Sequence, residues 1–151
     1  MQFPTVTARN LHGRQVTLLA GLQGKERVLL IAFQRWQQSL IDSWVPFLGR
    51  LEQDNPDLRY YELPVIRALP WLARSFIDGG MRAGIPDPTA RERTLTLYLD
   101  KRAFRAALDL PDEENIYLLL VDSQNQVRWR TRGAYTVEKG EALLARIEGG
   151  S

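Results

Sequence analysis

The chain has 151 residues, of which 44% are hydrophobic and 25% charged, with no cysteine and a formal net charge of +2. These values are typical of one folded domain that can bury a substantial core. The lack of cysteine excludes disulfides, thiolate metal sites and thiol nucleophiles. A net charge this small attracts nucleic acid weakly, so we expect no nucleic-acid partner. No apolar run reaches the roughly 20 residues of a membrane span. We expect a cytoplasmic protein, or the mature form of an organellar one.

The first third of the chain predicts strands separated by one helix. Residues 3–24 alternate apolar and polar around a turn at 10–13, which predicts a hairpin. The continuous apolar run at 28–33 predicts a buried central strand, and 59–65 predicts a second strand.

Between these two strands, apolar residues recur at helical spacing. They are Ile41, Trp44, Val45 and Leu48. Ser39 followed by Asp42 makes a capping-box pattern, which predicts that the helix begins at Ser39. Pro46 removes one backbone hydrogen bond and predicts a kink.

The rest of the chain alternates further helices and strands. We expect a short helix over 69–77, a long connection over 79–88, a strand over 94–99, and a helix over 102–108 capped by Asp100.

A hairpin and a final helix are predicted to complete the chain. The runs 116–121 and 127–131, joined by a turn at 122–125, predict an antiparallel hairpin, and Thr136 caps a last helix that ends at Gly149.

This order of elements predicts a single α/β domain over residues 1–151. Helices between strands indicate a parallel centre, and the hairpins add antiparallel strands, giving a mixed sheet. The order resembles the thioredoxin-like three-layer α/β/α sandwich in its peroxiredoxin-type (redoxin) form, which carries an N-terminal β-hairpin. Local sequence adds to this resemblance at residues 10–18, 22–25, 119–122 and 127–129, and at Trp36 and Pro46.

The sequence also resembles the assembly-factor family of the mitochondrial F-type ATP synthase and its bacterial relatives. The matching stretches are Tyr98-Leu99-Asp100, Leu108-Asp109-Leu110-Pro111, residues 116–122, residues 127–133 and Ser43-Trp44-Val45-Pro46-Phe47. This resemblance implies a non-redox binding or assembly protein, with a chaperone-like role. The implied partner is a protein client, such as a subunit of a membrane complex.

The redox groups of the superfamily are absent. Gln37-Gln38-Ser39-Leu40 stands where thioredoxins have two cysteines, and Ile116 stands where redox relatives have a cis-proline. A non-proline cis bond costs about 3 kcal/mol, so we expect a trans peptide at Ile116. The alternative function is that of a peroxiredoxin or thiol-reductase relative that is inactive or depends on an external thiol. An engineered Cys→Ser change at Ser39 would give the same sequence.

We predict no catalytic residue, no metal site and no cofactor, and a binding surface at the vacated redox site. Its candidate residues are Trp36, Gln37, Gln38, Ser39, Trp71 and Ile116, with the segment 70–88 beside them. Each has a structural alternative: Ser39 as a helix cap, the glutamines as a solvated loop, and the tryptophans as core. Ser39 as a nucleophile would need a base, and the only histidine, His12, lies in a predicted turn far along the sequence.

Arg128, Arg130 and Arg132 alternate along the last predicted strand and are expected on one face of it. They can meet phosphates or an acidic partner, or they can protect an edge strand from unwanted pairing. The acidic run 112–114 lacks the spaced oxygen ligands of a cation site, so we interpret it as a solvated turn.

Overall fold

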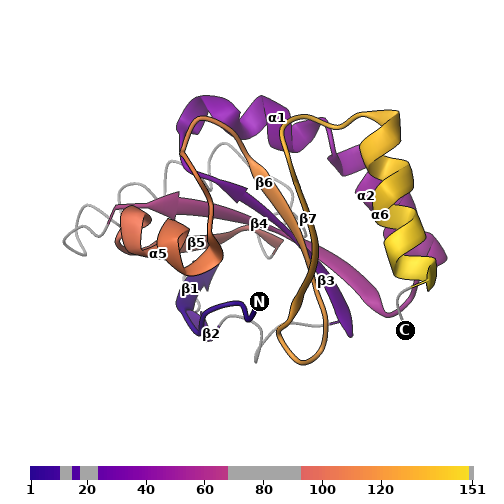
Figure 1. The fold of residues 1–151 in the computed structure, drawn as a ribbon, viewed down its shortest axis with the longest axis horizontal. Coiled ribbons are helices and arrows are strands. Elements are labelled where there is room, and N and C mark those ends of the chain that lie inside the picture. The colour runs from indigo at the N-terminus through magenta and orange to yellow at the C-terminus, as the bar shows by residue number, and fades with distance from the viewer. Residues whose placement is uncertain (11–14, 18–23, 68–92, 150–151) are drawn as a thin grey trace.

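A mixed sheet of seven strands organises the protein, in a computed structural model that describes residues 1–10, 15–17, 24–67 and 93–149. The strands run in the order β2-β1-β5-β4-β3-β6-β7 (Figure 1). Their bounds are β1 Thr7–Asn10, β2 Gln15–Thr17, β3 Glu26–Ala32, β4 Leu58–Ile66, β5 Leu95–Tyr98, β6 Tyr117–Val121 and β7 Val127–Arg132. The helical elements are the 3-10 turn η1 Arg35–Gln37, α1 Gln38–Asp42, α2 Val45–Asp54, α5 Lys101–Leu108 and α6 Val137–Gly149.

The predicted α/β fold with a mixed sheet is confirmed. Strand β4 pairs in parallel with both β3 and β5, whereas β6 is antiparallel to β3 and β7 is antiparallel to β6. The N-terminal hairpin of β1 and β2 continues the sheet on the far side, because β1 pairs antiparallel with β5. The continuous apolar runs in the sequence form the central strands, since those strands are covered on both faces.

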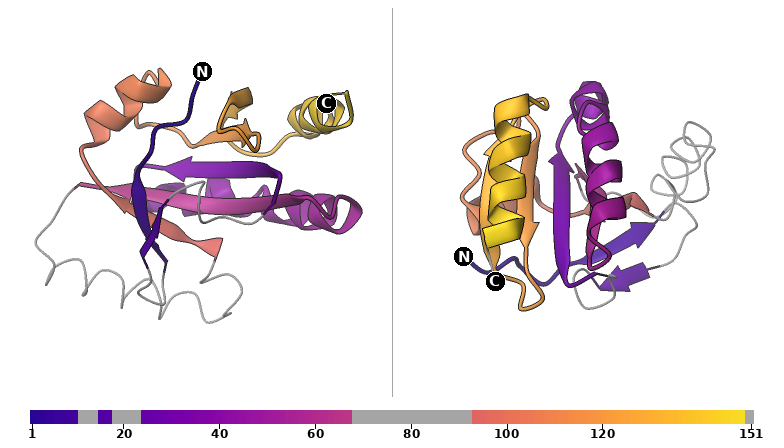
Figure 2. Two further views of the ribbon diagram at one scale, coloured as in Figure 1. Left: turned by 90° about the horizontal axis from the view of Figure 1, so that it is seen from below. Right: turned by 90° about the vertical axis from the view of Figure 1, so that its right-hand side faces the viewer.

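Helices cover the two faces of the sheet. On one face α1, α2 and α6 pack over a core that includes Val28, Trp44 and Leu143, all fully buried. On the other face α5 packs Phe104 and Leu108 over the second core. Helices α2 and α6 run side by side (Figure 2). Among the described residues, no helix is long and apolar enough to cross a membrane.

The predicted start of the first helix is wrong. Helical backbone begins earlier, at η1, directly after the extended residue Gln34. Ser39 lies inside α1, and its side chain does not cap the helix. Near Pro46, where a kink is predicted, a turn at Ser43 and Trp44 divides the helix into α1 and α2, and both turn residues keep right-handed helical backbone angles. Pro46 is the second residue of α2, where a missing backbone N–H leaves no helical hydrogen bond unmade.

The two other predicted caps are confirmed. The Asp100 carboxylate accepts a hydrogen bond from the Ala103 N–H at 3.1 Å, and the Thr136 hydroxyl accepts one from the Lys139 N–H at 3.2 Å. The helix predicted over 69–77 and the connection over 79–88 lie outside the described residues.

A β-bulge interrupts the predicted alternation of side chains along β7. Val121 pairs with Val127, but its neighbour Leu120 pairs with Trp129, so Arg128 is an extra residue between the two pairs. Val127 therefore packs on the α5 side of the sheet and Trp129 on the α6 side. An inserted residue reverses the alternation of side chains, which simple period-2 counting does not foresee.

Candidate functional site

Gln37 lies at the corner where β3 ends and the first helix begins, and its side chain is fully buried. The side-chain Oε1 accepts hydrogen bonds from the backbone N–H groups of Phe33 at 2.8 Å and Gln34 at 3.1 Å. The side-chain Nε2 donates to the backbone carbonyl of Glu113 at 2.8 Å. Gln37 therefore ties the corner to the 112–116 loop from within, instead of standing in a solvated loop.

Trp36 lies next to this buried amide and is exposed, with 58% of its surface open to solvent. Large aromatic side chains are usually buried, so an exposed one on a fixed backbone is a candidate contact for a partner. Trp44, by contrast, is fully buried and donates its indole N–H to the Gly133 carbonyl at 3.0 Å. The alternative that a tryptophan packs in the core is therefore true of Trp44 and not of Trp36.

Gln38 and Ser39 lie on the exposed side of the same corner. The Gln38 amide nitrogen donates to the carboxylates of Asp42 at 2.9 Å and Glu62 at 3.1 Å. Gln38 thereby connects the surface to a carboxylate on the sheet beneath α1.

Glu62 is an acidic group that the sequence interpretation missed. It lies on β4 with 9% of its surface exposed, and desolvation by burial raises the pKa of its carboxyl above the ordinary value of 4.5. The hydrogen bond from Gln38 lowers this pKa, the Asp42 charge raises it and the Arg93 charge lowers it. The available signal in the sequence was the position of Glu62 inside a predicted, mostly apolar strand. Both faces of such a strand are covered, so a carboxylate there is expected to be buried.

Arg93 completes this polar region. Its guanidinium pairs with Glu52 at 2.6 Å, donates to the Tyr60 carbonyl at 2.8 Å and lies 3.9 Å from the centre of the Tyr60 ring. Burial lowers the pKa of the Arg93 guanidinium, but the hydrogen bond to Glu52 and nearby negative charge raise it, and the net pKa lies above its ordinary value. These contacts use the charge of Arg93 to join α2 to β4.

Ile116 lies beneath the corner and not on its surface. It is fully buried in the core under α1, and its carbonyl accepts a hydrogen bond from the Gly133 N–H at 3.0 Å. Its peptide is trans as predicted, since the described residues contain no cis bond. Trp71 lies outside the described residues.

On the α5 side of the corner, charged groups hold the 112–116 loop. Lys101 donates to the Phe33 carbonyl at 2.8 Å and lies 3.8 Å from the Glu113 carboxylate, which Arg105 approaches at 3.2 Å. The Tyr117 hydroxyl donates to Asp112 at 2.9 Å. This bond lowers the pKa of the Asp112 carboxyl, whereas burial raises the pKa of the Tyr117 phenol.

The corner contains binding groups but no assembled nucleophile and base. Neither Ser39 nor Gln38 has a histidine partner among the described residues, and His12 lies outside them. No group of three or more histidine, aspartate or glutamate side chains in the described part of the chain could hold a metal ion. The site can thus position a ligand through hydrogen bonds and one exposed ring.

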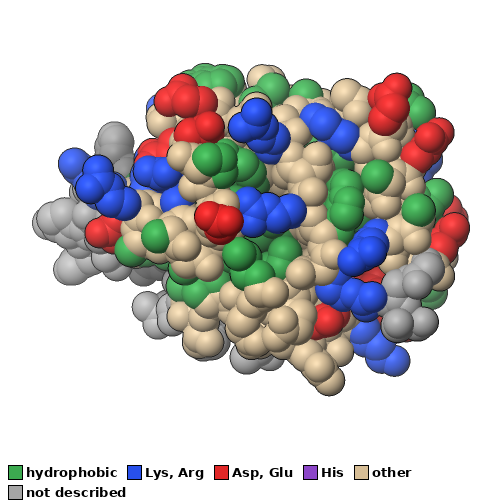
Figure 3. Space-filling view, in the orientation of Figure 1, with side chains coloured by type: hydrophobic (Ala, Val, Ile, Leu, Met, Phe, Trp, Pro, Cys, Tyr) green, Lys and Arg blue, Asp and Glu red, His purple; other side chains and the backbone are tan. Residues whose placement is uncertain are grey.

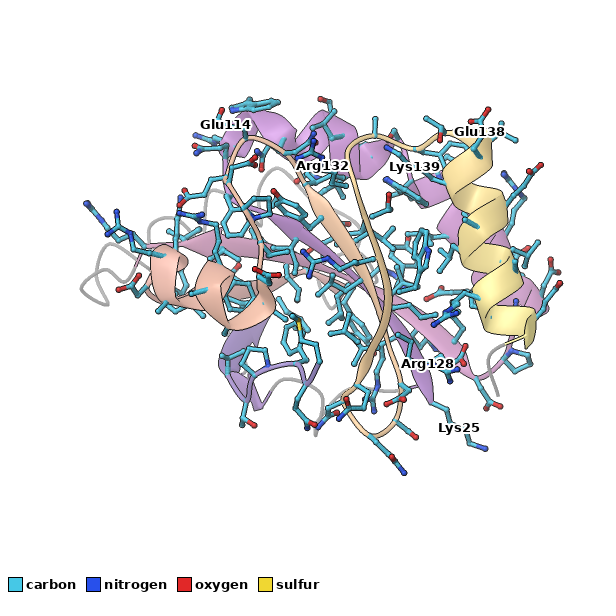
Figure 4. The ribbon with its side chains drawn as sticks, in the orientation of Figure 1. Lys25, Glu114, Arg128, Arg132, Glu138 and Lys139 are labelled. Carbon is cyan, nitrogen blue, oxygen red and sulfur yellow. The ribbon has the colours of Figure 1, made fainter. Side chains whose placement is uncertain are left out.

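The arginines of β7 form a second region, which meets the 112–116 loop of the corner at Arg132. The Arg130 guanidinium donates to the carbonyls of Leu108 and Asp109, both at 2.7 Å, and so ties β7 to the end of α5. Arg132 lies 3.9 Å from Asp112 with 61% of its side chain exposed. Arg128 and Arg132 lie toward opposite ends of the strand (Figure 4).

Comparison with known proteins identifies the fold from solved structures and the family from the sequence. No curated protein matches the sequence. Among solved structures, the chain is similar to the thioredoxin domain of a thiol-disulfide oxidoreductase from Bacteroides vulgatus, with 14% identity, a TM-score of 0.63, and 97% of this chain and 95% of that chain covered. It is also similar to BsSco, of the Sco family of cytochrome c oxidase assembly proteins, with 16% identity, a TM-score of 0.66 and coverage of 98% and 92%.

A thioredoxin-like protein from Aeropyrum pernix matches with 12% identity, a TM-score of 0.58 and coverage of 96% of this chain and 89% of that one. These likenesses show the thioredoxin-like fold. The model of the ATP10 protein family matches residues 1–149, nearly the whole sequence. The chain therefore belongs to the ATP10 protein family, the ATP synthase assembly family that its sequence resembles.

Proposed function

We propose that this chain is a non-redox binding protein that holds a protein client during assembly of the ATP synthase or of another membrane complex. Its family supplies the biological setting, and the absence of cysteine leaves the thioredoxin-like fold without thiol chemistry of its own. The observation that carries the proposal is the exposure of Trp36, directly before the residues that stand where thioredoxins have two cysteines.

The corner is suited to binding because its backbone is fixed before a client arrives. The buried Gln37 amide holds the chain on both sides of Trp36, so little conformational entropy is lost when the ring is covered. Gln38 and Ser39 provide a polar rim that can pair with a client's backbone. A subunit that presents an apolar pocket beside backbone groups matches this arrangement.

Pull-down of ATP synthase subunits from detergent-solubilised membranes tests the proposal. We expect Trp36→Ala to weaken capture by about ten-fold or more, as for a tryptophan at an interface hot spot. Val137→Ala is the matched control, because Val137 is 60% exposed and lies at the start of α6. Equal capture by wild type and Trp36→Ala, or capture of no synthase subunit by wild type, would contradict the proposal.

The enzyme alternative draws on similar structures that include a thiol-disulfide oxidoreductase. It requires an external thiol, because the chain supplies none. Peroxide consumption with glutathione or thioredoxin, measured for the wild type and for Ser39→Cys, separates the two functions. We expect neither protein to accelerate the reaction, and turnover by the wild type would support the enzyme instead.

A further inference from the structure

The edge strand β7 has an outward side that is open in its centre. At its two ends, side chains of α6 reach the outward carbonyls: Lys139 Nζ donates to the Arg132 carbonyl at 2.6 Å, and Arg146 Nε donates to the Arg128 carbonyl at 3.1 Å. Both contacts are exposed to solvent. At the first end the Val127 N–H also donates to the Met1 carbonyl at 2.7 Å, so the backbone of the N-terminal segment pairs there. The flexible side chains on the Arg128 and Arg132 carbonyls can move aside at small cost.

Between these ends, the backbone groups of every second residue point away from the sheet. The Gly133 N–H bonds inward to the Ile116 carbonyl, and backbone direction alternates along an antiparallel strand. The backbone N–H and carbonyl of Arg132 therefore point away from the sheet, as the bond from Lys139 to the Arg132 carbonyl shows. The backbone groups of Arg130, two residues earlier, point the same way. Their N–H groups and the Arg130 carbonyl form a short ladder that another strand can join.

Positive charge accompanies this ladder. On the face shown in Figure 3, Lys and Arg side chains lie in separate groups over β7 and the adjoining part of α6, with hydrophobic and other side chains between them. The cations from the strand and the helix are Arg128, Arg130, Arg132, Lys139 and Arg146. Asp112 approaches Arg132 only to 3.9 Å, and the Arg128 charge acts on Glu26. The Arg130 guanidinium binds backbone carbonyls and no carboxylate. The positive charge is thus only partly neutralised within the described residues.

The two features together select the partner's chemistry. A second copy pairing through its own β7 would bring arginines opposite arginines, which destabilises a strand pair. Lipid headgroups and nucleic acids would complement the positive charge but would not pair with the alternating backbone donors and acceptors. An extended peptide with acidic side chains does both.

We propose that β7 accepts an extended acidic peptide segment as an additional strand of the sheet. The segment's backbone pairs with Arg130 and Arg132, and its carboxylates lie beside the arginines on the α5 side. Lys139 and Arg146 release the end carbonyls and turn toward the segment's acidic groups. This surface does not include Trp36, so we expect the Trp36 ring to be removable without loss of peptide binding.

A peptide of alternating glutamate and valine residues tests the proposal, with a lysine–valine peptide as its counterpart. We expect the acidic peptide alone to bind, to shift the amide resonances of Arg130 and Arg132, and to protect those amides from hydrogen exchange. Arg132→Pro removes one outward N–H without touching the inward ladder, and Arg132→Ala keeps that N–H. Both variants lose the same charge, so we expect Arg132→Pro to bind about five-fold more weakly than Arg132→Ala.

Three results would overturn the proposal. One is equal affinity of the two variants for the acidic peptide, and another is resonance shifts confined to residues outside β7. The third is binding of phosphatidylserine vesicles or single-stranded oligonucleotides at least as tight as that of the peptide. Amide shifts in the wild type provide an answer even if Arg132→Pro does not fold, and Trp36→Ala should leave peptide binding unchanged.

Discussion

Two buried polar side chains near α1, Gln37 at its start and Glu62 on β4, have opposite consequences for the protein. Gln37 is neutral, and its oxygen and nitrogen are satisfied by three hydrogen bonds to backbone groups. Glu62 is ionisable and desolvated, and it receives a side-chain hydrogen bond from Gln38 while a second carboxylate, Asp42, lies near enough to raise its pKa. Burial makes the first group a source of pH-independent stability and the second a source of pH-dependent strain.

Gln37→Leu is expected to have the largest effect. Leucine is similar in size but leaves two backbone N–H groups and one carbonyl without their partner. The Phe33 N–H is buried and costs about 1 kcal/mol or more when unpaired, whereas the Gln34 and Glu113 groups are part-buried and cost less, so we expect a loss of about 2 kcal/mol in the free energy of unfolding. Urea denaturation measures this loss.

Gln37→Glu tests the comparison directly, because it makes position 37 ionisable, as position 62 is. The glutamate can still accept from the Phe33 and Gln34 N–H groups, but only its protonated form can donate to the Glu113 carbonyl. Its deficit in unfolding free energy should therefore shrink on acidification. A deficit that is constant between pH 4 and pH 8 would show that the Glu113 bond contributes little.

Glu62→Gln is expected to stabilise the protein at neutral pH, by about 1 kcal/mol, because it removes a desolvated charge and keeps an acceptor for Gln38. In the wild type the raised pKa means that folded Glu62 keeps its proton to higher pH than unfolded Glu62. The stability from that proton is present in full below pH 4.5 and is lost as pH rises through the folded pKa.

The difference in unfolding free energy between the wild type and Glu62→Gln reports the contribution of Glu62 alone. Unfolding free energies measured from pH 4 to pH 8 should show the variant gaining on the wild type as pH rises. A difference that stays flat would mean that folded and unfolded Glu62 release the proton at the same pH. Arg93→Met sharpens the result, since loss of the Arg93 charge should raise the Glu62 pKa further.

Local patterns in the sequence predicted the elements that local chemistry decides. The apolar runs at 28–33 and 116–121 correspond to β3 and β6, and the caps at Asp100 and Thr136 bond within three residues. Such features need no knowledge of distant parts of the chain.

The missed features depend on distant contacts. The Gln37 amide is a structural link because it reaches Glu113, 76 residues away. The bulge at Arg128 adjoins a contact of the Val127 N–H with the Met1 carbonyl, at the other end of the chain. Exposure of Trp36 likewise follows from how the corner is folded, and its sequence neighbours do not distinguish it from the buried Trp44.

Two serines extend the comparison from buried contacts to the surface, where the smallest effects are expected. The Ser43 hydroxyl donates to the Leu40 carbonyl at 2.6 Å and accepts from the Tyr135 N–H at 2.9 Å, joining α1 to the segment before α6, whereas Ser39 makes no cap. Ser43→Ala should cost about 1 kcal/mol of unfolding free energy and Ser39→Ala less than about 0.5 kcal/mol. A helix cap at Ser39 would instead cost about 1 kcal/mol. Thermal and urea denaturation of the two variants side by side therefore tests whether the helix begins at η1, because a larger loss from Ser39→Ala would restore the start that the sequence pattern predicts.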